Sequence, residues 1–401
     1  MSRPFTLEIE HPIAIASKHE VAILRQAVAA NPHAIKLRRR LGVLLFVEDK
    51  FDEAIDLFSG ILAEDPDADI AWHLAEAFIS LETPEGDRRS EAAARQSFEL
   101  AHNSYERANA LAALGKALRR QGRDDEARAA LIAALGENPH DTNAYKRLVA
   151  LDLAKGAYDE ILTFADGLVA RGVGHSRLMV GRALAYAMQG QIDLAREAIG
   201  LDRFLFQSMM TPPQGWPSTA DLNAAVKAEL ARHPDLRFDR YGTASTATWR
   251  IDRPAFPDST AIAALQGRIR EAVMAHVAVL DQQDALWTNL RPAETLLHNW
   301  CVLTDADGFE EWHVHQGGWM SGVYYVDVPE VVSSGDGKGG CLAFGLPEDV
   351  VGEDIAAQFG ETLIRPVAGL LMLFPSHAYH RTFAHGSHQR RICLAFDIKA
   401  L

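Results

Sequence analysis

The sequence predicts an α + β protein of two domains, an α-helical solenoid followed by a β-rich domain with flanking helices. Three observations lead to this prediction. The chain has 401 residues, which fits two or three domains better than one. Ala/Leu-rich helical patterns with a 34-residue period fill the first part, and short apolar runs between Gly/Pro turns fill the second. The composition changes near residue 205, so we place the domains at 1–204 and 205–401.

Composition narrows the class of protein. The 40 Lys and Arg against 54 Asp and Glu leave a net charge of −14, which argues against a nucleic-acid partner. The three cysteines contain no CxxC pair, so neither a disulfide framework nor a zinc knuckle is expected. The N-terminus has no continuous apolar stretch, and no run of about 18 apolar residues occurs, so we expect no membrane partner. Together these features predict a cytoplasmic protein.

The helical period is visible in two well-matched copies. Pro32 and Pro66 each follow an Asn or Asp and lie 34 residues apart. In such a helix–turn–helix repeat, small residues at positions 8 and 20 let the helices approach, and a bulky residue at position 24 fills the contact. The copies that begin at residues 35 and 108 have these residues and the closing proline: Gly42, Ala54, Phe58 and Pro66 in the first, and Gly115, Ala127, Leu131 and Pro139 in the second.

Further copies follow at the same spacing. Residue 142 begins one with Tyr145 and Leu148, and residue 176 begins another with Ala183 and Ala195. A poorer copy at 69–107 carries Trp72 and the insertion TPEGDRRS. About five repeats over residues 20–205 therefore resemble the tetratricopeptide family. The resemblance implies a concave groove that holds a peptide or a partner's helix, while an inert spacer or a dimerisation surface stays open.

The C-terminal half predicts a double-sheet jelly roll of the cupin type, also called a double-stranded β-helix. STATWRI is typical of a strand, and AIAALQGRIREAVMAHVAVL has the apolar spacing of an amphipathic helix. Short β-runs follow, separated by Gly/Pro/Ser turns: TLLHNWCVLT, EWHVHQ, WMSGVYYVDVP, GCLAFG, GLLMLFP and RRICLAFDI.

Three histidines and an arginine lie on these expected strands. His313 and His315 are two residues apart, so on a strand they face the same side and can reach one ion. His380 follows another apolar strand, and Arg391 begins the last strand 11 residues later. A metal that binds O₂ needs a facial set of three ligands, and a guanidinium nearby can hold the far carboxylate of a dicarboxylate. We therefore expect a metal site at His313, His315 and His380, with Arg391 as an anion anchor.

The order H-x-[D/H], H, R resembles the 2-oxoglutarate/iron(II) oxygenase superfamily in its prolyl-hydroxylase-like branch. The stretches HVHQGGWMSGVYYVDVP and GLLMLFPSHAYHRTFAHGSHQRRICLAFDI resemble a bacterial family of such oxygenases, over roughly residues 205–401. The resemblance implies Fe(II) as the metal and 2-oxoglutarate as cosubstrate. It also implies that His313 and His380 are catalytic iron ligands, that Arg391 anchors the cosubstrate, and that Tyr325 donates to the same carboxylate.

One residue departs from the superfamily pattern. The usual second ligand is Asp, and His315 stands in its place, so three neutral imidazoles leave the iron one negative charge short. His315 is therefore either a ligand, or a neighbour of the site with Asp327 or a water completing the set. Arg390 is an alternative anchor, although it should face away from the side of Arg391. Other histidines have no role assigned: His298, His377, His385 and His388.

These observations predict a 2-oxoglutarate-dependent dioxygenase, a hydroxylase that acts with O₂ on a residue of a protein or peptide presented by the repeats. Two other hypotheses stay open. One is a non-catalytic repeat scaffold with a degenerate cupin-like module that binds a partner protein. The other is a cupin-like hydrolase or isomerase that binds zinc or manganese. The sequence identifies neither the oxidised residue nor the final product, and it leaves open a homodimer.

Overall fold

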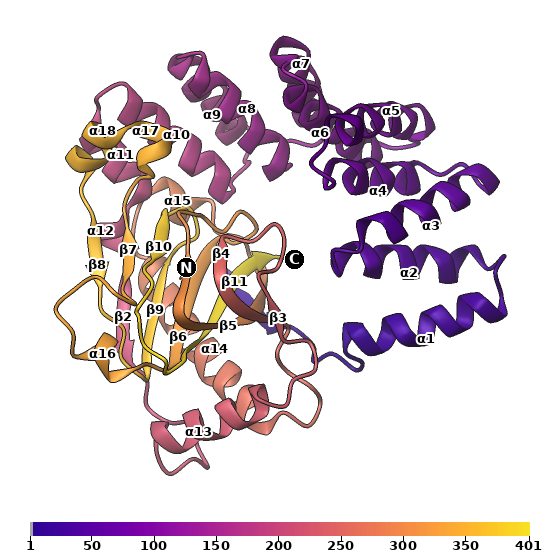
Figure 1. Ribbon diagram of the computed structural model, residues 1–401. Coiled ribbons are helices and arrows are strands. Elements are labelled where there is room, and N and C mark those ends of the chain that lie inside the picture. The colour runs from indigo at the N-terminus through magenta and orange to yellow at the C-terminus, as the bar shows by residue number, and fades with distance from the viewer. Residues whose placement is uncertain (1–2) are drawn as a thin grey trace. The chain divides into compact units, whose positions relative to one another are not determined.

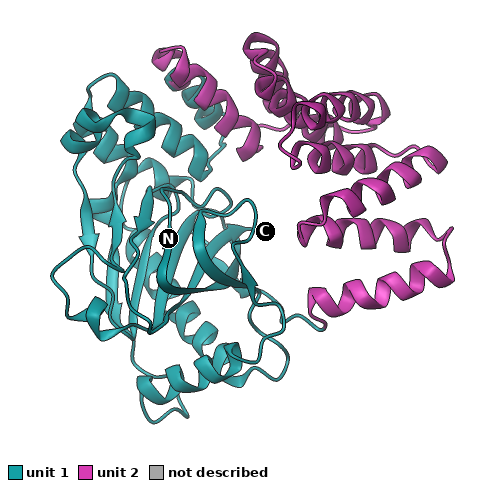
Figure 2. Cartoon of the chain, in the orientation of Figure 1, with its two compact units in different colours: residues 1–14, 162–401 teal, residues 15–161 magenta. Residues whose placement is uncertain are grey.

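The computed structural model describes residues 3–401 and divides into two compact units (Figure 2). One unit contains the chain up to Ala14 together with Leu162–Leu401, and the other is Ile15–Ile161. The helical unit is thus inserted into the chain of the unit that holds the sheet. The boundary expected at residue 204 marks the change in composition, whereas the contacts divide the chain inside the helical region.

The helices follow one another as the repeat pattern predicts (Figure 1). After α1 (Ser17–Ala30) come five successive pairs: α2 (Ile35–Val47) and α3 (Phe51–Glu64), α4 (Ala68–Ile79) and α5 (Pro84–Leu100), α6 (Ser104–Arg120) and α7 (Asp124–Glu137), α8 (Thr142–Ala154) and α9 (Tyr158–Ala170), α10 (Ser176–Met188) and α11 (Ile192–Ile199). A short α12 (Leu201–Phe204) follows. The insertion TPEGDRRS forms the start of α5, where the Thr83 hydroxyl caps the helix by accepting from the Gly86 N–H. The α-helical solenoid is confirmed.

Two glycines show why the repeat needs a small residue at its eighth position. A Cβ atom on Gly42 would lie 2.6 Å from the Phe58 ring, and one on Gly115 would lie 2.7 Å from Leu131. Phe58 and Leu131 are fully buried. The bulky residue of the second helix therefore occupies the space that the glycine of the first leaves open.

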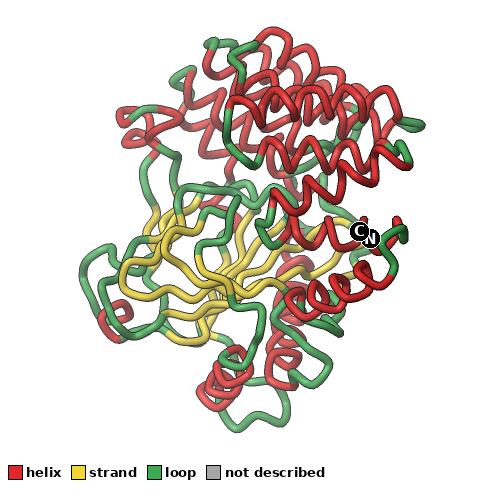
Figure 3. Tube along the Cα trace, turned by 45° about the vertical axis from the view of Figure 1, so that its right-hand side comes forward, coloured by secondary structure: helices red, strands yellow, loops and turns green. Residues whose placement is uncertain are grey.

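The C-terminal part forms two β-sheets, as expected for the jelly roll (Figure 3). The large sheet has the order β2-β9-β6-β11-β5-β4-β3, with β1 also on β5, and the small sheet has the order β10-β7-β8. The strands are β1 (Thr6–Ile9), β2 (Phe206–Met209), β3 (Arg237–Phe238), β4 (Ser245–Asp252), β5 (Glu294–Glu310), β6 (Met320–Asp327), β7 (Leu342–Phe344), β8 (Thr362–Ile364), β9 (Leu370–Pro375), β10 (His380–Thr382) and β11 (Arg391–Ala400). Every pair is antiparallel except β1 with β5.

The two faces of the large sheet differ in what covers them. Alternate residues of β11, such as Leu394 and Phe396, share a core with α14 (Thr260–Leu280), whose side of the sheet is closed by apolar packing. Cys393 shares a second core with Leu342 and Phe344 of the small sheet. Because strand side chains alternate, β11 contributes to both cores, and its inward-facing residues lie between the two sheets. The remaining helices are α13 (Thr219–Leu230), α15 (Leu286–Asn289), α16 (Glu330–Ser333), α17 (Glu348–Val351) and α18 (Glu353–Phe359).

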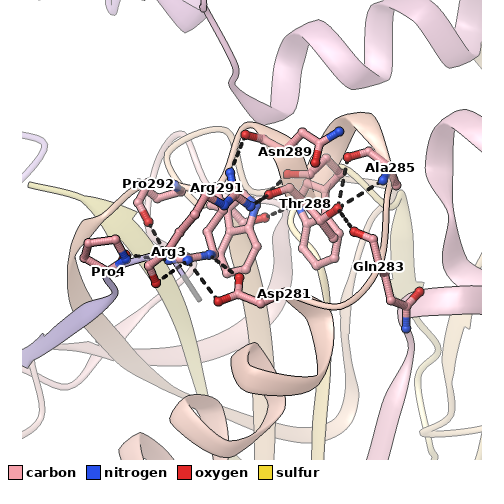
Figure 4. A network of polar contacts seen from close by, with 11 residues as sticks. Arg3, Pro4, Asp281, Gln283, Ala285, Thr288, Asn289, Arg291 and Pro292 are labelled. Atoms are coloured by element: carbon pink, nitrogen blue, oxygen red, sulfur yellow. Dashed lines mark hydrogen bonds and ion pairs between the residues drawn. The ribbon is translucent and has the colours of Figure 1, made fainter. Parts of the chain in front are cut away.

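The N-terminal segment is fastened to this unit by a polar network (Figure 4). The Arg291 guanidinium donates to the backbone carbonyls of Arg3 and Pro4 at 3.1 Å each, and it pairs with Asp281 at 2.9 Å. The Arg3 guanidinium donates in turn to the carbonyl of Asn289 at 2.6 Å. These contacts hold the residues that lead into β1, although the helical unit separates them in sequence from the rest of the sheet.

One expected strand is absent. The segment with His313 and His315 lies between β5 and β6 as irregular chain, joined by a single antiparallel bridge between His313 and His380. Their backbone N–H and C=O groups exchange two hydrogen bonds of 3.0 Å, and the His315 N–H donates to the Ser376 carbonyl at 3.0 Å. The chain has left the large sheet after Glu310 and passes beside β10, so it pairs for one residue only.

Candidate metal centre

The structure brings His313, His315 and His380 together. One ligand atom from each lies within 4.8 Å of those of the other two, and the Nε2 atoms of His313 and His315 are 3.3 Å apart. The backbone bridge between His313 and His380 places their rings face to edge, with centroids 4.1 Å apart. A bridge between two chain segments thus does what a shared strand face was expected to do.

The second nitrogen of each ring has a fixed role. Nδ1 of His313 lies 2.7 Å from the Glu311 carbonyl, and Nδ1 of His380 lies 2.9 Å from the Ala378 carbonyl. Nδ1 of His315 lies 2.6 Å from the Asp397 carboxylate. Carbonyls accept only and the carboxylate is ionised, so each Nδ1 carries the proton and each Nε2 keeps a lone pair. Three lone pairs that face one another are the donor set of a divalent metal ion.

Burial keeps two of these rings neutral. Desolvation, with the neighbouring His315 as a second cause, lowers the pKa of His313 to about 3. Desolvation, together with His313 and His315, lowers the pKa of His380 well below its usual value. Both imidazoles are therefore unprotonated near neutral pH, as metal ligands must be.

Asp397 is a site residue that the sequence analysis missed. Its carboxylate accepts from His315 and, at 2.7 Å, from the Ser321 hydroxyl. Burial raises the pKa of this carboxyl, but the His315 ring and the Ser321 hydroxyl more than offset that effect, so its pKa is lowered. A negative charge therefore lies directly behind His315, one ring away from the position where the superfamily has its aspartate. The signal was present, since Asp397 lies six residues after Arg391 on the same face of one strand.

Asp327 does not join the histidines. Its side chain makes an ion pair with Lys227 at the end of β6 and does not line the cavity that contains the three rings. The alternative in which Asp327 completes the ligand set is therefore not what the side chains form. The partner of His315 is Asp397.

The histidines open into a cavity of about 410 Å³ between the two sheets. Inward-facing side chains of β11, β5 and β6 form much of its wall: Arg391, Cys393, Ala395, Asp397 and Lys399 from β11, His298, Trp300 and Val302 from β5, and Val323 and Tyr325 from β6. Phe374, Leu342 and Thr382 close it from the other side. His298, to which no role was assigned, thus lines the cavity, and its Nδ1 lies 2.9 Å from the Glu10 carboxylate.

Arg391 is buried in this cavity with neutral partners only. Its guanidinium donates to the Gly340 carbonyl at 2.8 Å and to the hydroxyls of Thr304 and Thr382 at 3.1 and 3.5 Å. Within the described part of the chain no carboxylate lies at ion-pair distance from it, and only 2% of the residue is exposed. A buried cation without a counter-ion is costly, so a site of this kind is suited to an anion.

The neighbouring candidates lie where strand alternation places them. Arg390 pairs with Asp305 through two contacts of 2.9 Å and is not part of the cavity wall. Tyr325 is buried in the same wall as Arg391, and desolvation raises the pKa of its phenol despite the nearby guanidinium. Tyr325 is therefore a neutral O–H group beside a cation, and both can donate to a carboxylate.

Two further histidines have structural partners. His377 is buried and its Nε2 lies 3.1 Å from the carbonyls of Ala198 and Ile199 at the end of α11. His385 contacts the Thr304 carbonyl at 3.1 Å. Neither lines the cavity.

Comparisons with known families match both halves. A family model described as "Putative 2OG-Fe(II) oxygenase" matches residues 298–397, and two tetratricopeptide-repeat models match residues 21–77 and 108–151. No curated protein matches the chain. Among the helices of residues 3–401, none has the length and apolar character that a membrane span requires.

Several solved structures resemble parts of the chain. A prolyl-4-hydroxylase of Pseudomonas putida is 19% identical over 53% of this chain and 99% of its own, with a TM-score of 0.34. The pilF protein of Pseudomonas aeruginosa is 16% identical over 47% of this chain and 83% of its own, with a TM-score of 0.39. YrrB, described as a TPR protein with an unusual peptide-binding site, is 17% identical over 45% and 92%, with a TM-score of 0.34.

The expected family resemblances are thereby confirmed. Helix pairs with the repeat period and two family matches coincide in the first half, and the two-sheet unit with its histidine cavity coincides with the third match. The chain carries tetratricopeptide repeats in its N-terminal half and a domain of the 2OG-Fe(II) oxygenase family at its C-terminal end.

Proposed function

We propose that this protein is an Fe(II)- and 2-oxoglutarate-dependent dioxygenase that hydroxylates a residue of a protein or peptide held by its helical repeats. One observation carries the proposal. The same cavity contains three imidazoles with converging Nε2 lone pairs and a buried guanidinium without a carboxylate partner. The first is a metal-binding arrangement, and the second is an anion-binding one.

The residues fit both groups. His313, His315 and His380 would hold the iron, because imidazole nitrogen is a good ligand for Fe(II) and all three rings are held in the required tautomer. Asp397 would partly replace the charge that the usual aspartate ligand supplies. Arg391 and Tyr325 would hold the far carboxylate of 2-oxoglutarate. When bound, the iron and this cosubstrate supply the oxidising chemistry.

The surrounding side chains position these groups and keep the cavity apolar around them. Trp300 and Phe374 pack beside His315, with ring centroids 5.2 and 6.5 Å from it. Val302 and Val323 complete a wall without acidic or basic groups between the histidines and Arg391. Such a wall limits access of water to the reacting centre and fixes the position of the target carbon.

The peptide substrate follows from the repeats. Tetratricopeptide arrays form concave surfaces that hold extended or helical segments of other proteins. A groove of this kind beside a hydroxylase in one chain favours a polypeptide over a free metabolite as the substrate. Turnover of small amino acids at equal rate with and without the array would contradict this part of the proposal.

Two other functions are less well supported. A scaffold without catalysis has no need for three histidines held in the metal-binding tautomer. A zinc or manganese hydrolase or isomerase has no need for a buried arginine that lacks a counter-ion. The replacement of the usual aspartate by His315 remains the best argument for the scaffold.

Anaerobic titration of the purified apo-protein with Fe(II) and then 2-oxoglutarate tests the proposal. We expect the weak visible charge-transfer band of an iron–2-oxoglutarate chelate in the wild type and its loss in His313→Ala and His380→Ala. His388→Ala is the matched control, because this exposed histidine lies outside the cavity. A wild-type protein that binds no iron tightly and gives no band would instead favour the scaffold.

A further inference from the structure

We propose that the cavity holds a carboxylate of the substrate at Arg250 and Arg240, so that the hydroxylated molecule carries an acidic group close to the reacting carbon. The proposal rests on the proposed function and names the class of its substrate. It concerns a second cationic centre in the same cavity as Arg391.

The two cationic centres are separated by the sheet. Arg250 on β4 pairs with Val302 on β5, which pairs in turn with Cys393 on β11. Arg391 lies two residues from Cys393 along β11, so two strand spacings, about 10 Å, separate the strands of the two arginines. Arg240 lies in the loop between β3 and β4, on the same side of the cavity as Arg250. The second centre is therefore distinct from the one assigned to 2-oxoglutarate.

The second centre contains more positive than negative charge. One carboxylate, Asp252, is shared by three guanidiniums, at 2.7 Å from Arg250, 2.9 Å from Arg240 and 3.0 Å from Arg237. Burial raises the pKa of Asp252, but the three arginines outweigh burial and lower it, so the carboxylate stays ionised. Three positive charges and one negative charge leave an excess of +2.

Other charges near this centre do not remove the excess. Glu310 also lines the cavity, where its carboxylate accepts from the Ser245 hydroxyl at 2.8 Å and burial raises its pKa. If Glu310 is ionised the excess is +1, and if it is protonated the excess remains +2. On the opposite wall, Lys399 and His298 face the cavity with Asp397, whose charge is already engaged by His315. In a chain of net charge −14 this concentration of cations is local.

Arg250 is also held close to the metal centre. Its guanidinium lies over the Trp300 ring at 4.7 Å from the ring centre, and the same ring lies 5.2 Å from His315. The side chain is therefore ordered before any ligand arrives, which lowers the entropy cost of binding an anion. An anion held by Arg250 would lie one aromatic ring from the histidines.

An ion-pair network that only stabilises the fold would not need this arrangement. Arg237 alone already neutralises Asp252, from a position outside the cavity wall. Arg250 and Arg240 add charge on the side that faces the cavity. Because Arg237 and Arg250 make similar ion pairs with Asp252 and are 14% and 15% exposed, Arg237 offers a matched control.

The test uses fluorescent nonapeptide pools and the anaerobic protein loaded with Fe(II) and 2-oxoglutarate. One pool has a central Glu or Asp and an amidated C-terminus, a second has Gln or Asn instead, and a third has a free C-terminal carboxylate without acidic side chains. We expect the wild type to bind one of the carboxylate pools about tenfold more tightly than the amide pool, because charge-assisted hydrogen bonds are worth that much. The pool preferred distinguishes a side-chain carboxylate from a chain end.

The variants decide the assignment. Arg250→Gln should remove the preference for the carboxylate pool while leaving the iron–2-oxoglutarate band unchanged, and Arg237→Gln should preserve both. Equal binding of all pools by the wild type would overturn the inference, as would equal loss of preference in the two variants. Loss of the band in Arg250→Gln would also overturn it, since that arginine would then serve the cosubstrate. Absence of the band in the wild type would instead contradict the proposed function.

Discussion

The helical array and the cavity treat buried charge in opposite ways. In the array, Arg38 is buried against Glu64 at 2.8 Å, and the buried carboxylate of Asp152 is matched by Arg128 at 2.7 Å. In the cavity, the equally buried Arg391 has carbonyl and hydroxyl partners only. Each array charge named here has an opposite charge within its own unit, whereas the cavity charge lacks one.

This difference separates charges that stabilise from charges that bind. A compensated pair contributes to the folded state by itself, and removal of one member leaves the other without a partner. An uncompensated guanidinium costs stability until an anion arrives, and then it contributes to the affinity for that anion. The cavity is thus arranged for a ligand, and the array charges named above for the fold.

The largest expected effect is at Arg391. Arg391→Gln should weaken 2-oxoglutarate binding by about 100-fold or more, because two charge-assisted hydrogen bonds are lost. The stability of the ligand-free protein should stay the same or rise, since an unpaired buried charge is removed. Calorimetric titration with 2-oxoglutarate and thermal unfolding measure the two effects.

Arg390→Gln is the matched control for Arg391, because the adjacent arginine pairs with Asp305 outside the cavity. It should leave 2-oxoglutarate binding unchanged. If both variants lost binding equally, or if Arg391→Gln alone unfolded the protein, Arg391 would be a compensated structural charge and the comparison with the array would not hold.

A smaller effect is expected at Asp397. Asp397→Asn keeps an acceptor for the His315 Nδ1–H and removes only the charge, so Fe(II) affinity should fall about 10- to 100-fold. Ser321→Ala is the control, since it removes a neutral hydrogen bond to the same carboxylate. Competition with a fluorescent iron chelator gives the affinities. Unchanged affinity in Asp397→Asn would mean that the carboxylate only orients the ring.

The smallest effect concerns the array. Arg128→Gln leaves the Asp152 carboxylate, whose side chain is 3% exposed, without its cation, and should lower the free energy of unfolding by about 1–3 kcal/mol. Arg107→Gln breaks a half-exposed pair with Glu137 and should lower it by less than about 1 kcal/mol. Urea unfolding followed by helical circular dichroism measures both. Impaired 2-oxoglutarate binding in Arg128→Gln would show that the array charges are not confined to stability.

The helical half was predictable because its contacts are local. Gly42 and Phe58 are 16 residues apart, as are Gly115 and Leu131, so one repeat period contains both sides of the contact. The large sheet was less so: its β1 strand lies before the helical unit and pairs with β5, which no local pattern announces. Pairing over such a distance leaves no short-range spacing to read.

The candidate site divides in the same way. His313, His380 and Arg391 are separated by strand and turn patterns that resemble a known order, so their positions could be proposed. Asp397 is 82 residues from His315, and Glu10 is 288 residues from His298, so these partners become visible only when the sheet is assembled. The shared carboxylate of Asp252 was invisible for another reason. Alternating Arg and Asp on an edge strand is also common on solvated surfaces.

The insertion of the helical unit after β1 constrains how the chain can be divided. A fragment that begins after the repeats would lack β1 and the anchor that Arg291 forms with Arg3 and Pro4, and it would lose the Glu10 carboxylate beside His298. An engineered deletion that joins Ala14 to Leu162 through a short linker would keep all of these. The first strand therefore acts as a remote clasp, so that excision, rather than truncation, is the design for an oxygenase free of its repeats.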